Sequence, residues 1–231
     1  MAASLHLAHY SPQDTRRMLG SMWRHRRALA ATPGLSAVRL NMLAELDTTF
    51  GGTPMPTRWG LLCGWESGDA RDEFLVDAAG LRPFLDGARE SWSVSLDTVR
   101  VVLGDWHGWR PATDGVARLA ADEPVMVRTH GRQRARHLPV FTWSNRKVVR
   151  AVAANPGLVM GLGFFDHPLV RATLSLWRSE QAAVEFAYRS APHDQIQRRS
   201  LQVPWATLYF FARFRPTASS GSWDGRDPLA E

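Results

Sequence analysis

The 231-residue sequence contains only one cysteine, Cys63, and only one lysine, Lys147. A single cysteine excludes an internal disulfide and any multi-cysteine zinc or iron–sulfur site within one chain, and we expect Cys63 to be a small buried residue. No apolar stretch approaches the roughly 20 residues that a membrane helix needs. Residues 1–10 lack a charged segment followed by a long apolar one, so we expect a cytoplasmic protein that touches a membrane, if at all, from outside.

Two kinds of catalytic motif are also absent. The sequence has no glycine-rich phosphate loop, and it has no serine or cysteine nucleophile motif. These absences exclude the classical nucleotide-binding and hydrolase classes. What is present is enough apolar material for a large core, because 45% of the residues are hydrophobic.

The charge balance is basic, with a formal net charge of +6 and an isoelectric point near 10.5. Such a balance favours an acidic partner, whether nucleic acid, an anionic membrane surface or an acidic protein such as a ferredoxin. The arginines form two clusters: Arg24, Arg26, Arg27 and Arg128, Arg132, Arg134, Arg136. No nucleic-acid-binding motif accompanies them, so we expect solvated surface and no nucleic-acid partner.

Hydrophobic periodicity predicts the same order of elements twice, as strand, helix, strand, strand, helix, strand. The first set is strand 5–9, helix 12–31, strands 35–44 and 58–65, helical material in 68–90 broken near Gly80 and Pro83, and strand 99–103. The second set is strand 124–129, helix 145–154, strands 158–165 and 170–177, a helix from Glu180, and strand 207–214. Each set is a ferredoxin-like βαββαβ unit.

Matching residues support the repeat. Residues 32–35 (Thr-Pro-Gly-Leu) end the first helix of copy one as residues 155–158 (Asn-Pro-Gly-Leu) do in copy two. Residues 65–67 (Trp-Glu-Ser) correspond to residues 177–179 (Trp-Arg-Ser), and each serine can cap the next helix. Copy one differs by a glycine-, threonine- and proline-rich insertion, 47–57, which predicts a loop.

These observations predict an α+β fold of tandem ferredoxin-like repeats that form a barrel of the dimeric α+β type. The expected division is copy one, 1–111, the structural partner; a connector, 112–122; copy two, 123–216, which holds the ligand pocket; and a tail, 217–231. Because the interior between the two sheets is concave and apolar, we expect the ligand there. The chain is expected to be a monomer or a homodimer.

The third strand of copy two differs in chemistry from its counterpart. Arg171, Thr173, Ser175 and Trp177 share one face, whereas copy one has Trp59, Leu61, Cys63 and Trp65 there. The opposite face in copy two is apolar enough to pack under helices, so we expect the polar face to look into the barrel. An arginine and two hydroxyls in an apolar cavity indicate a ligand, although Arg171 could instead reach solvent at the rim.

Two further features single out copy two. Gly161 and Gly163 lie on one face of a strand and indicate close approach by a ligand or backbone, or a bulge. His193 aligns with Leu81 of copy one, and it would share a helix face with Ile196. One imidazole in an apolar cavity suits a haem iron, although a surface or core histidine has the same spacing.

The C-terminal half resembles the spheroidene monooxygenases, which are carotenoid ketolases of the CrtA type. Matching segments follow the family's order over about 80 residues: Pro156-Gly157-Leu158, the Gly161/Gly163 strand, Leu174-Ser175-Leu176-Trp177, Phe186-Ala187-Tyr188-Arg189, Pro192-His193, Ile196 with Arg198-Arg199, Phe211-Ala212-Arg213-Phe214, and Gly221-Ser222-Trp223-Asp224-Gly225. Copy one matches more weakly, through residues 57–59 and 65–67. Residues 201–208, apolar and interrupted by proline, depart from the family's pattern, which leaves the substrate open.

The resemblance implies a haem b protein that oxidises an apolar or small organic substrate, with His193 as the iron ligand. Arg171 or Arg189 would stabilise a bound oxygen species or a haem propionate. The remaining pocket residues would be Gly161, Gly163, Phe164, Phe165, Thr173, Ser175, Trp177, Phe186 and Ile196.

The sequence also leaves other functions open. The same architecture would suit a haem-dependent dehydratase similar to the aldoxime dehydratases, or another non-oxygenase haem enzyme. A non-catalytic barrel that binds a small ligand, or a basic module that binds nucleic acid, is the third reading.

Overall fold

A computed structural model describes residues 2–47, 52–77, 79–106, 108–110, 118–165, 169–189 and 205–230. Within these ranges, none of the helices is both long and apolar enough to span a membrane.

Each copy supplies four strands and its own helices. Copy one contains β1 (Ala2–His9), α1 (Pro12–Ala30), β2 (Leu35–Glu45), β3 (Pro54–Trp65), α2 (Gly68–Asp77), the 3-10 turn η1 (Ala79–Leu81), α3 (Arg82–Leu85) and β4 (Glu90–Leu103). Copy two contains β5 (Val125–Gln133), the 3-10 turn η2 (Ala135–His137), α4 (Leu138–Ala153), β6 (Leu158–Phe165), β7 (Val170–Trp177), α5 (Glu180–Arg189) and β8 (Ala206–Gly221).

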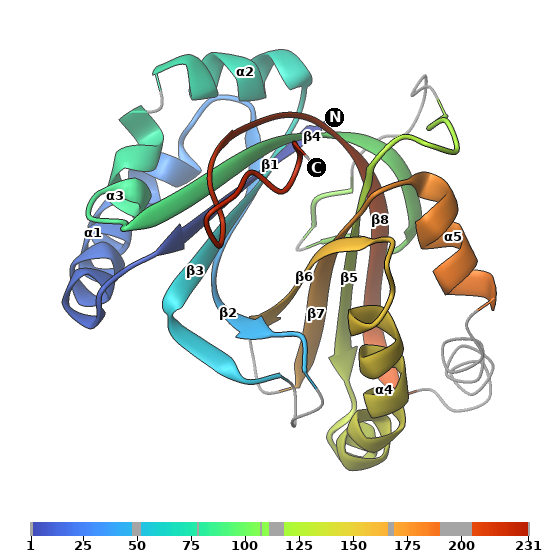
Figure 1. Cartoon of the computed structure of the whole chain (residues 1–231). Coiled ribbons are helices and arrows are strands. Elements are labelled where there is room, and N and C mark those ends of the chain that lie inside the picture. The colour runs from blue at the N-terminus through green and yellow to red at the C-terminus, as the bar shows by residue number, and fades with distance from the viewer. Residues whose placement is uncertain are drawn as a thin grey trace.

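The eight strands form one closed barrel in the order β1-β3-β2-β6-β7-β5-β8-β4. Each copy contributes a four-stranded sheet with its first strand in the centre, and the sheets join through the β2–β6 and β4–β8 pairs. Figure 1 shows α1, α2 and α3 on one side of the molecule and α4 and α5 on the other. The predicted α+β barrel of two ferredoxin-like units is therefore confirmed.

The pairing registers show how closely the copies correspond. Trp65 pairs with Ala2 and Trp177 pairs with Val125, the first residues of the central strands β1 and β5. In copy one the Ser67 hydroxyl accepts a hydrogen bond from the amide of Ala70 at 3.1 Å, and the Ser179 hydroxyl caps α5 at the same distance. Both serines therefore cap their helices as predicted.

Several element boundaries were predicted wrongly. Helix α4 begins at Leu138 rather than at 145, because residues 138–144 form its first two turns although they are rich in β-branched and aromatic residues. Strand β4 begins at Glu90 rather than at 99. Strand β8 continues to Gly221, into the expected tail, because its serines and threonines pair with β4. The insertion 47–57 is partly strand, since β3 begins at Pro54.

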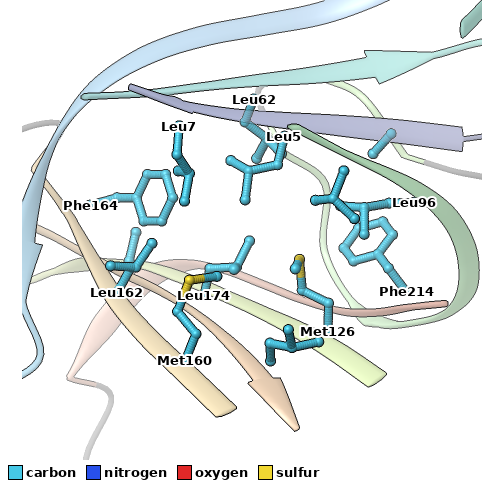
Figure 2. Packing of buried hydrophobic residues seen from close by; sticks show 14 of the residues in the cluster. Leu5, Leu7, Leu62, Leu96, Met126, Met160, Leu162, Phe164, Leu174 and Phe214 are labelled. Carbon is cyan, nitrogen blue, oxygen red and sulfur yellow. The ribbon is translucent and has the colours of Figure 1, made fainter. Parts of the chain in front are cut away.

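The barrel interior is filled by apolar side chains from both sheets. Figure 2 shows Leu5, Leu7 and Leu62 of copy one packed against Phe164 and Leu174 of copy two. The expectation of a ligand cavity between the sheets is therefore wrong. Close packing of the two inner faces is what holds the copies together, because each sheet carries its helices on the outer face only.

One charged side chain lies inside this core. Arg128, which we expected on the solvated surface with its neighbours, is only 2% exposed. Its guanidinium carbon lies 4.4 Å from the centre of the Phe164 ring, close enough for a cation–π interaction. Alternation along β5 accounts for the correction, because Met126 on the same face is also buried in the core.

Tryptophans close both ends of the barrel. Trp109 packs over Gly64, where an added Cβ would lie 2.7 Å from the indole, and it stacks on Phe214 with ring centres 6.5 Å apart. Trp223 of the tail is buried in the same core cluster. The Arg58 guanidinium carbon lies 4.9 Å from the Trp223 ring centre, and its NH2 group donates to Asp224 at 2.6 Å.

Two carboxylates anchor the tail. Asp227 accepts hydrogen bonds from the Trp92 indole at 2.8 Å, from the Ser219 hydroxyl at 2.7 Å and from the amide of Leu229 at 3.0 Å. Burial by itself would raise the pKa of Asp227, but these hydrogen bonds hold the pKa below its usual value. Glu90 has a lowered pKa for the same balance of reasons, with hydrogen bonds from the tail.

These lowered pKa values predict acid sensitivity. A carboxylate with a lower pKa in the folded state stabilises the fold above its unfolded-state pKa, and this contribution disappears as the pH falls through the folded-state pKa. We expect the free energy of unfolding to decrease below about pH 4. Urea denaturation at stepped pH should show a shallower decrease for Asp227→Asn, and identical pH profiles for the variant and the wild type would contradict this.

Candidate functional site

A cavity of about 480 Å³ lies on the outer face of the copy-two sheet, beneath α4 and α5. We call it the copy-two groove. Its floor is formed by β5, β6, β7 and β8, its roof by α4 and α5, and its ends by residues 45–47 of copy one and by Arg100 on β4. The volume lies within the usual range of small-molecule sites, about 300 to 1,000 Å³.

Strand alternation explains which side chains reach the groove. Ala172 and Leu174 of β7 belong to the barrel core, so Arg171, Thr173 and Ser175 point outward, toward the helices. The prediction that these three residues line a pocket agrees with their position, but the prediction that they look into the barrel is wrong. The physical reason is that both faces of the copy-two sheet are covered, the inner face by the other sheet and the outer face by α4 and α5. The polarity of the side chains therefore does not tell which face is the inner one.

The groove is lined mainly by apolar side chains. The rings of Trp177 and Phe186 lie 5.2 Å apart, where β7 meets α5. The Trp177 indole donates a hydrogen bond to the Ser175 hydroxyl at 2.9 Å. The hydroxyls of Thr129 and Thr173 are hydrogen bonded at 2.6 Å across β5 and β7. These mutual contacts satisfy hydroxyls that would otherwise be costly to place beneath helices.

Arginines supply the positive charge of the groove. Arg171 lines it from β7, Arg146 from α4 and Arg100 from β4. Burial lowers the pKa of Arg171 from its usual value, but a guanidinium remains charged at neutral pH. A fourth arginine, Arg213, is tied to Glu180 by an ion pair that links β8 to α5. Arg171, Arg146 and Arg100 thus add positive charge to the groove, and Glu45 and Asp47 add negative charge at its copy-one end.

The two glycines of β6 mark close approach by copy one. A Cβ added to Gly161 would lie 2.9 Å from a methyl group of Leu46, and one added to Gly163 would lie 3.2 Å from the Ala44 Cβ and 3.3 Å from its carbonyl oxygen. The sequence left open whether a ligand, another backbone segment or a bulge explains these glycines. The structure shows close approach by another segment of the chain. Gly163 lines the groove, whereas Leu46 occupies the space over Gly161.

This arrangement predicts unequal effects of adding side chains. Gly163→Val pushes a branched side chain against the backbone of β2 at the seam of the barrel, and overpacking of this kind costs about 1 to 3 kcal/mol. Gly161→Ala should cost less, because a leucine side chain can rotate away. Urea denaturation of both variants measures the difference, and a larger loss of stability for Gly161→Ala would contradict the prediction.

In copy one the space between sheet and helices is filled. Met18, Cys63, Trp65 and Phe84 form one buried cluster there, and Leu81, which aligns with His193, belongs to it. Cys63 is buried, as expected. The same sheet face carries the buried His6.

His6 takes the register position that Thr129 holds in copy two. Its ring nitrogens lie 2.8 Å from the Ser93 hydroxyl and 3.0 Å from the Ser4 hydroxyl. Burial lowers the pKa of His6 to about 3, so the ring is neutral and serves the packing.

Not every predicted pocket residue reaches the groove with its side chain. Phe164 and Phe165 both line it, although Phe164 also packs in the barrel core. Arg189 is 80% exposed, lies 3.5 Å from Glu185 on α5 and is not among the lining residues. His193 and Ile196 lie outside the described residues, as do residues 201–204 of the segment 201–208.

Among the contributors to the groove that sequence reasoning missed are Arg146, Arg100 and Leu46. Arg146 had a signal, because it lies one turn after Thr142, which is buried on α4 and also lines the groove. The other two come from copy one, across the seams of the barrel. No spacing within copy two could have indicated them.

The residues present fit a haem. The groove combines a mainly apolar lining with four arginines, and a porphyrin is a flat apolar ring that carries two carboxylates. Among the described residues there is no cluster of three or more histidine, cysteine or acidic side chains that could hold a metal ion by itself. A haem iron needs only one protein ligand. His130 is the only histidine among the described lining residues, but strand alternation places it on the barrel face with Met126.

No family model matches the chain. It is 29% identical over 199 residues to the spheroidene monooxygenase of Rhodobacter capsulatus, covering 84% of this chain and 81% of that protein. It is 23% identical over 188 residues to the spheroidene monooxygenase of Cereibacter sphaeroides, covering 80% of this chain but only 57% of that longer protein.

A crystal structure of aldoxime dehydratase shares the fold, with a TM-score of 0.60, 10% sequence identity and coverage of 99% of this chain and 85% of that one. At that identity the likeness concerns the fold alone. The two sequence matches extend over both copies. Both relatives are named spheroidene monooxygenase, which is the family that the segments of copy two resemble. The chain is therefore similar to the spheroidene monooxygenases over most of its length, and these relatives support an oxidoreductase.

Proposed function

We propose that the chain is a haem-dependent monooxygenase that oxidises an apolar or small organic substrate in the copy-two groove. The observation that carries the proposal is the groove itself, a mainly apolar cavity of about 480 Å³ with four arginines in its lining. The two relatives named spheroidene monooxygenase support the reaction class. The resemblance of the segment around His193 supports that residue as the iron ligand.

Bound haem would supply an iron that activates dioxygen with two external electrons, so that one oxygen atom enters a C–H bond and the other leaves as water. The arginines of the groove would hold the carboxylates of the porphyrin, because a guanidinium donates two parallel hydrogen bonds to a carboxylate. Arg171 is the least exposed of the three partners Arg171, Arg146 and Arg100, since Arg100 and Arg146 are exposed.

The apolar lining would have a second task. Trp177, Phe186 and Val148 cover the groove between β7 and the two helices, and they would exclude water from the reacting atoms. The hydrogen bond between Thr129 and Thr173 removes two hydroxyls from competition with the substrate. An apolar substrate would then bind by burial of its surface rather than by polar contacts.

The test separates this proposal from the other enzyme class. Purified protein, reconstituted with haem where needed, should show the absorption spectrum of a haem protein that changes on reduction and on addition of carbon monoxide. Substrate oxidation should require both dioxygen and a reductant. Turnover of an aldoxime without either would contradict the monooxygenase proposal and favour a dehydratase, and protein that fails to bind haem would contradict both.

A further inference from the structure

The outer face of α1 in copy one is exposed, basic and aromatic. The Trp23 side chain is 66% exposed, and Leu19, one turn earlier, is 36% exposed. Figure 1 shows α1 at the edge of the molecule beside α3. The opposite face of α1 packs on the copy-one core through Thr15, Met18, Met22 and Leu29, so the exposed face is fixed relative to the barrel.

The charges of α1 are of nearly one sign. All five of its arginines are exposed, and its single acidic residue, Asp14, lies in the first turn. Five arginines and one aspartate leave the helix with a net charge of +4. Asp14 caps the start of the helix with Ser11 and pairs with Arg17 at 3.0 Å, which leaves the later turns without any carboxylate. The arginines are Arg16, Arg17, Arg24, Arg26 and Arg27.

Trp23 and Arg26 form one exposed unit. The Arg26 guanidinium carbon lies 3.7 Å from the centre of the Trp23 ring, and its NH1 group donates to the Trp23 carbonyl oxygen. A stacked indole and guanidinium present an apolar surface and a positive charge at the same depth. That combination suits the boundary between lipid headgroups and acyl chains, where tryptophan and arginine both accumulate.

We infer that α1 docks the protein on an anionic membrane surface, with Trp23 inserted at the headgroup level and the arginines in contact with lipid phosphates. The occupant follows from charge and shape. A helix with a basic exposed face and an exposed tryptophan matches a broad anionic surface with an apolar layer beneath it. Nucleic acid would match the charge, but a single convex helix face gives it fewer backbone contacts than a groove that follows the strand.

The inference is independent of the copy-two groove, because α1 packs on the other sheet. If the substrate is apolar, which rests on the proposed function, the bilayer is also where that substrate collects. Failure of membrane docking would leave the haem proposal unchanged. Failure of haem binding would equally leave the docking of α1 unchanged.

Vesicle cosedimentation of the full chain tests the inference. The wild type should bind phosphatidylcholine vesicles that contain about a third phosphatidylglycerol, and it should bind pure phosphatidylcholine far less. Each arginine near an anionic surface contributes roughly fivefold in affinity, so the double variant Arg24→Gln/Arg27→Gln should bind roughly 25-fold more weakly. Trp23→Ala should lose roughly tenfold, since the indole is the main apolar contact.

A matched control comes from copy two. Trp143 on α4 is also 66% exposed, so Trp143→Ala removes an equally accessible indole from the other side of the barrel. This variant should bind vesicles as the wild type does. Equal losses for Trp23→Ala and Trp143→Ala would overturn the assignment to α1. Binding to duplex DNA without binding to anionic vesicles at the same salt concentration would overturn the membrane partner.

Discussion

Replacing His193 by alanine is expected to abolish haem binding while leaving the fold intact. A haem iron takes four ligands from the porphyrin and one from the protein, so removal of that one ligand has no local substitute. Among the described residues of the groove, the only imidazole is that of His130, whose strand position faces the barrel. The porphyrin absorption band during a haem titration measures the effect.

His25 provides the control for this experiment. It is exposed on α1, where its ring lies 2.9 Å from the carbonyl oxygen of Ser21, far from the copy-two groove in the fold. His25→Ala should bind haem as the wild type does. Unchanged haem binding by His193→Ala would contradict the assignment of His193 as the iron ligand. Equal thermal unfolding temperatures of the two variants would show that a loss of haem binding is not caused by misfolding.

Replacing Trp109 by alanine is expected to cost about 3 to 5 kcal/mol of unfolding free energy. Trp109 is 4% exposed and stacks on Phe214 of copy two, and it contacts Trp106 edge to face with ring centres 6.0 Å apart. Its removal opens one end of the barrel between the sheets. Surrounding side chains cannot collapse onto the space, because Gly64 has no side chain to fill it.

Urea denaturation measures this loss, and Trp143→Ala again serves as the control. Because the Trp143 side chain is mostly exposed, its removal should change the stability by no more than about 0.5 kcal/mol. Similar losses for the two variants would contradict a packed barrel closed by Trp109. A large loss of unfolding free energy in Trp109→Ala would also argue against an open ligand cavity between the two sheets.

The repeat was predictable from sequence because its anchors are local. Proline and glycine at the end of the first helix, and a serine cap before the second, are determined by backbone conformation within a few residues. The same backbone hydrogen bond recurs in both copies. The Glu66 amide donates to the Gly34 carbonyl oxygen, and the Arg178 amide donates to the Gly157 carbonyl oxygen, each at 2.9 Å. Alternation in β7 likewise predicted which residues share a face.

The location of the site was not predictable in the same way. Alternation assigns Arg171 and Leu174 to opposite faces, but it does not say which face meets the other sheet. That choice depends on packing between residues more than 100 positions apart, such as Leu5 against Leu174. The contributions of Leu46 and Arg100 to the groove depend on the closure of the barrel, which no local pattern encodes.

The length of the β4–β8 pairing was also not predictable from the sequence. The ends of β4 and β8 carry serine, threonine and aspartate, which have low or mixed strand propensity, yet the two strands pair from Trp92 with Gly221 to Leu103 with Phe211. Pairing with a partner from the other copy overrides local propensity. The tail then folds back onto Trp92 through Asp227.

A haem titration of the groove-filling variant Thr173→Phe tests most directly that the copy-two groove holds the cofactor. Thr173 lies in the middle of the groove floor, opposite Thr129, and a phenyl ring there would occupy the space under α4 and α5. The wild type should bind one haem per chain, and the variant should bind none while unfolding at a similar temperature. Equal haem binding by the two proteins would contradict the account.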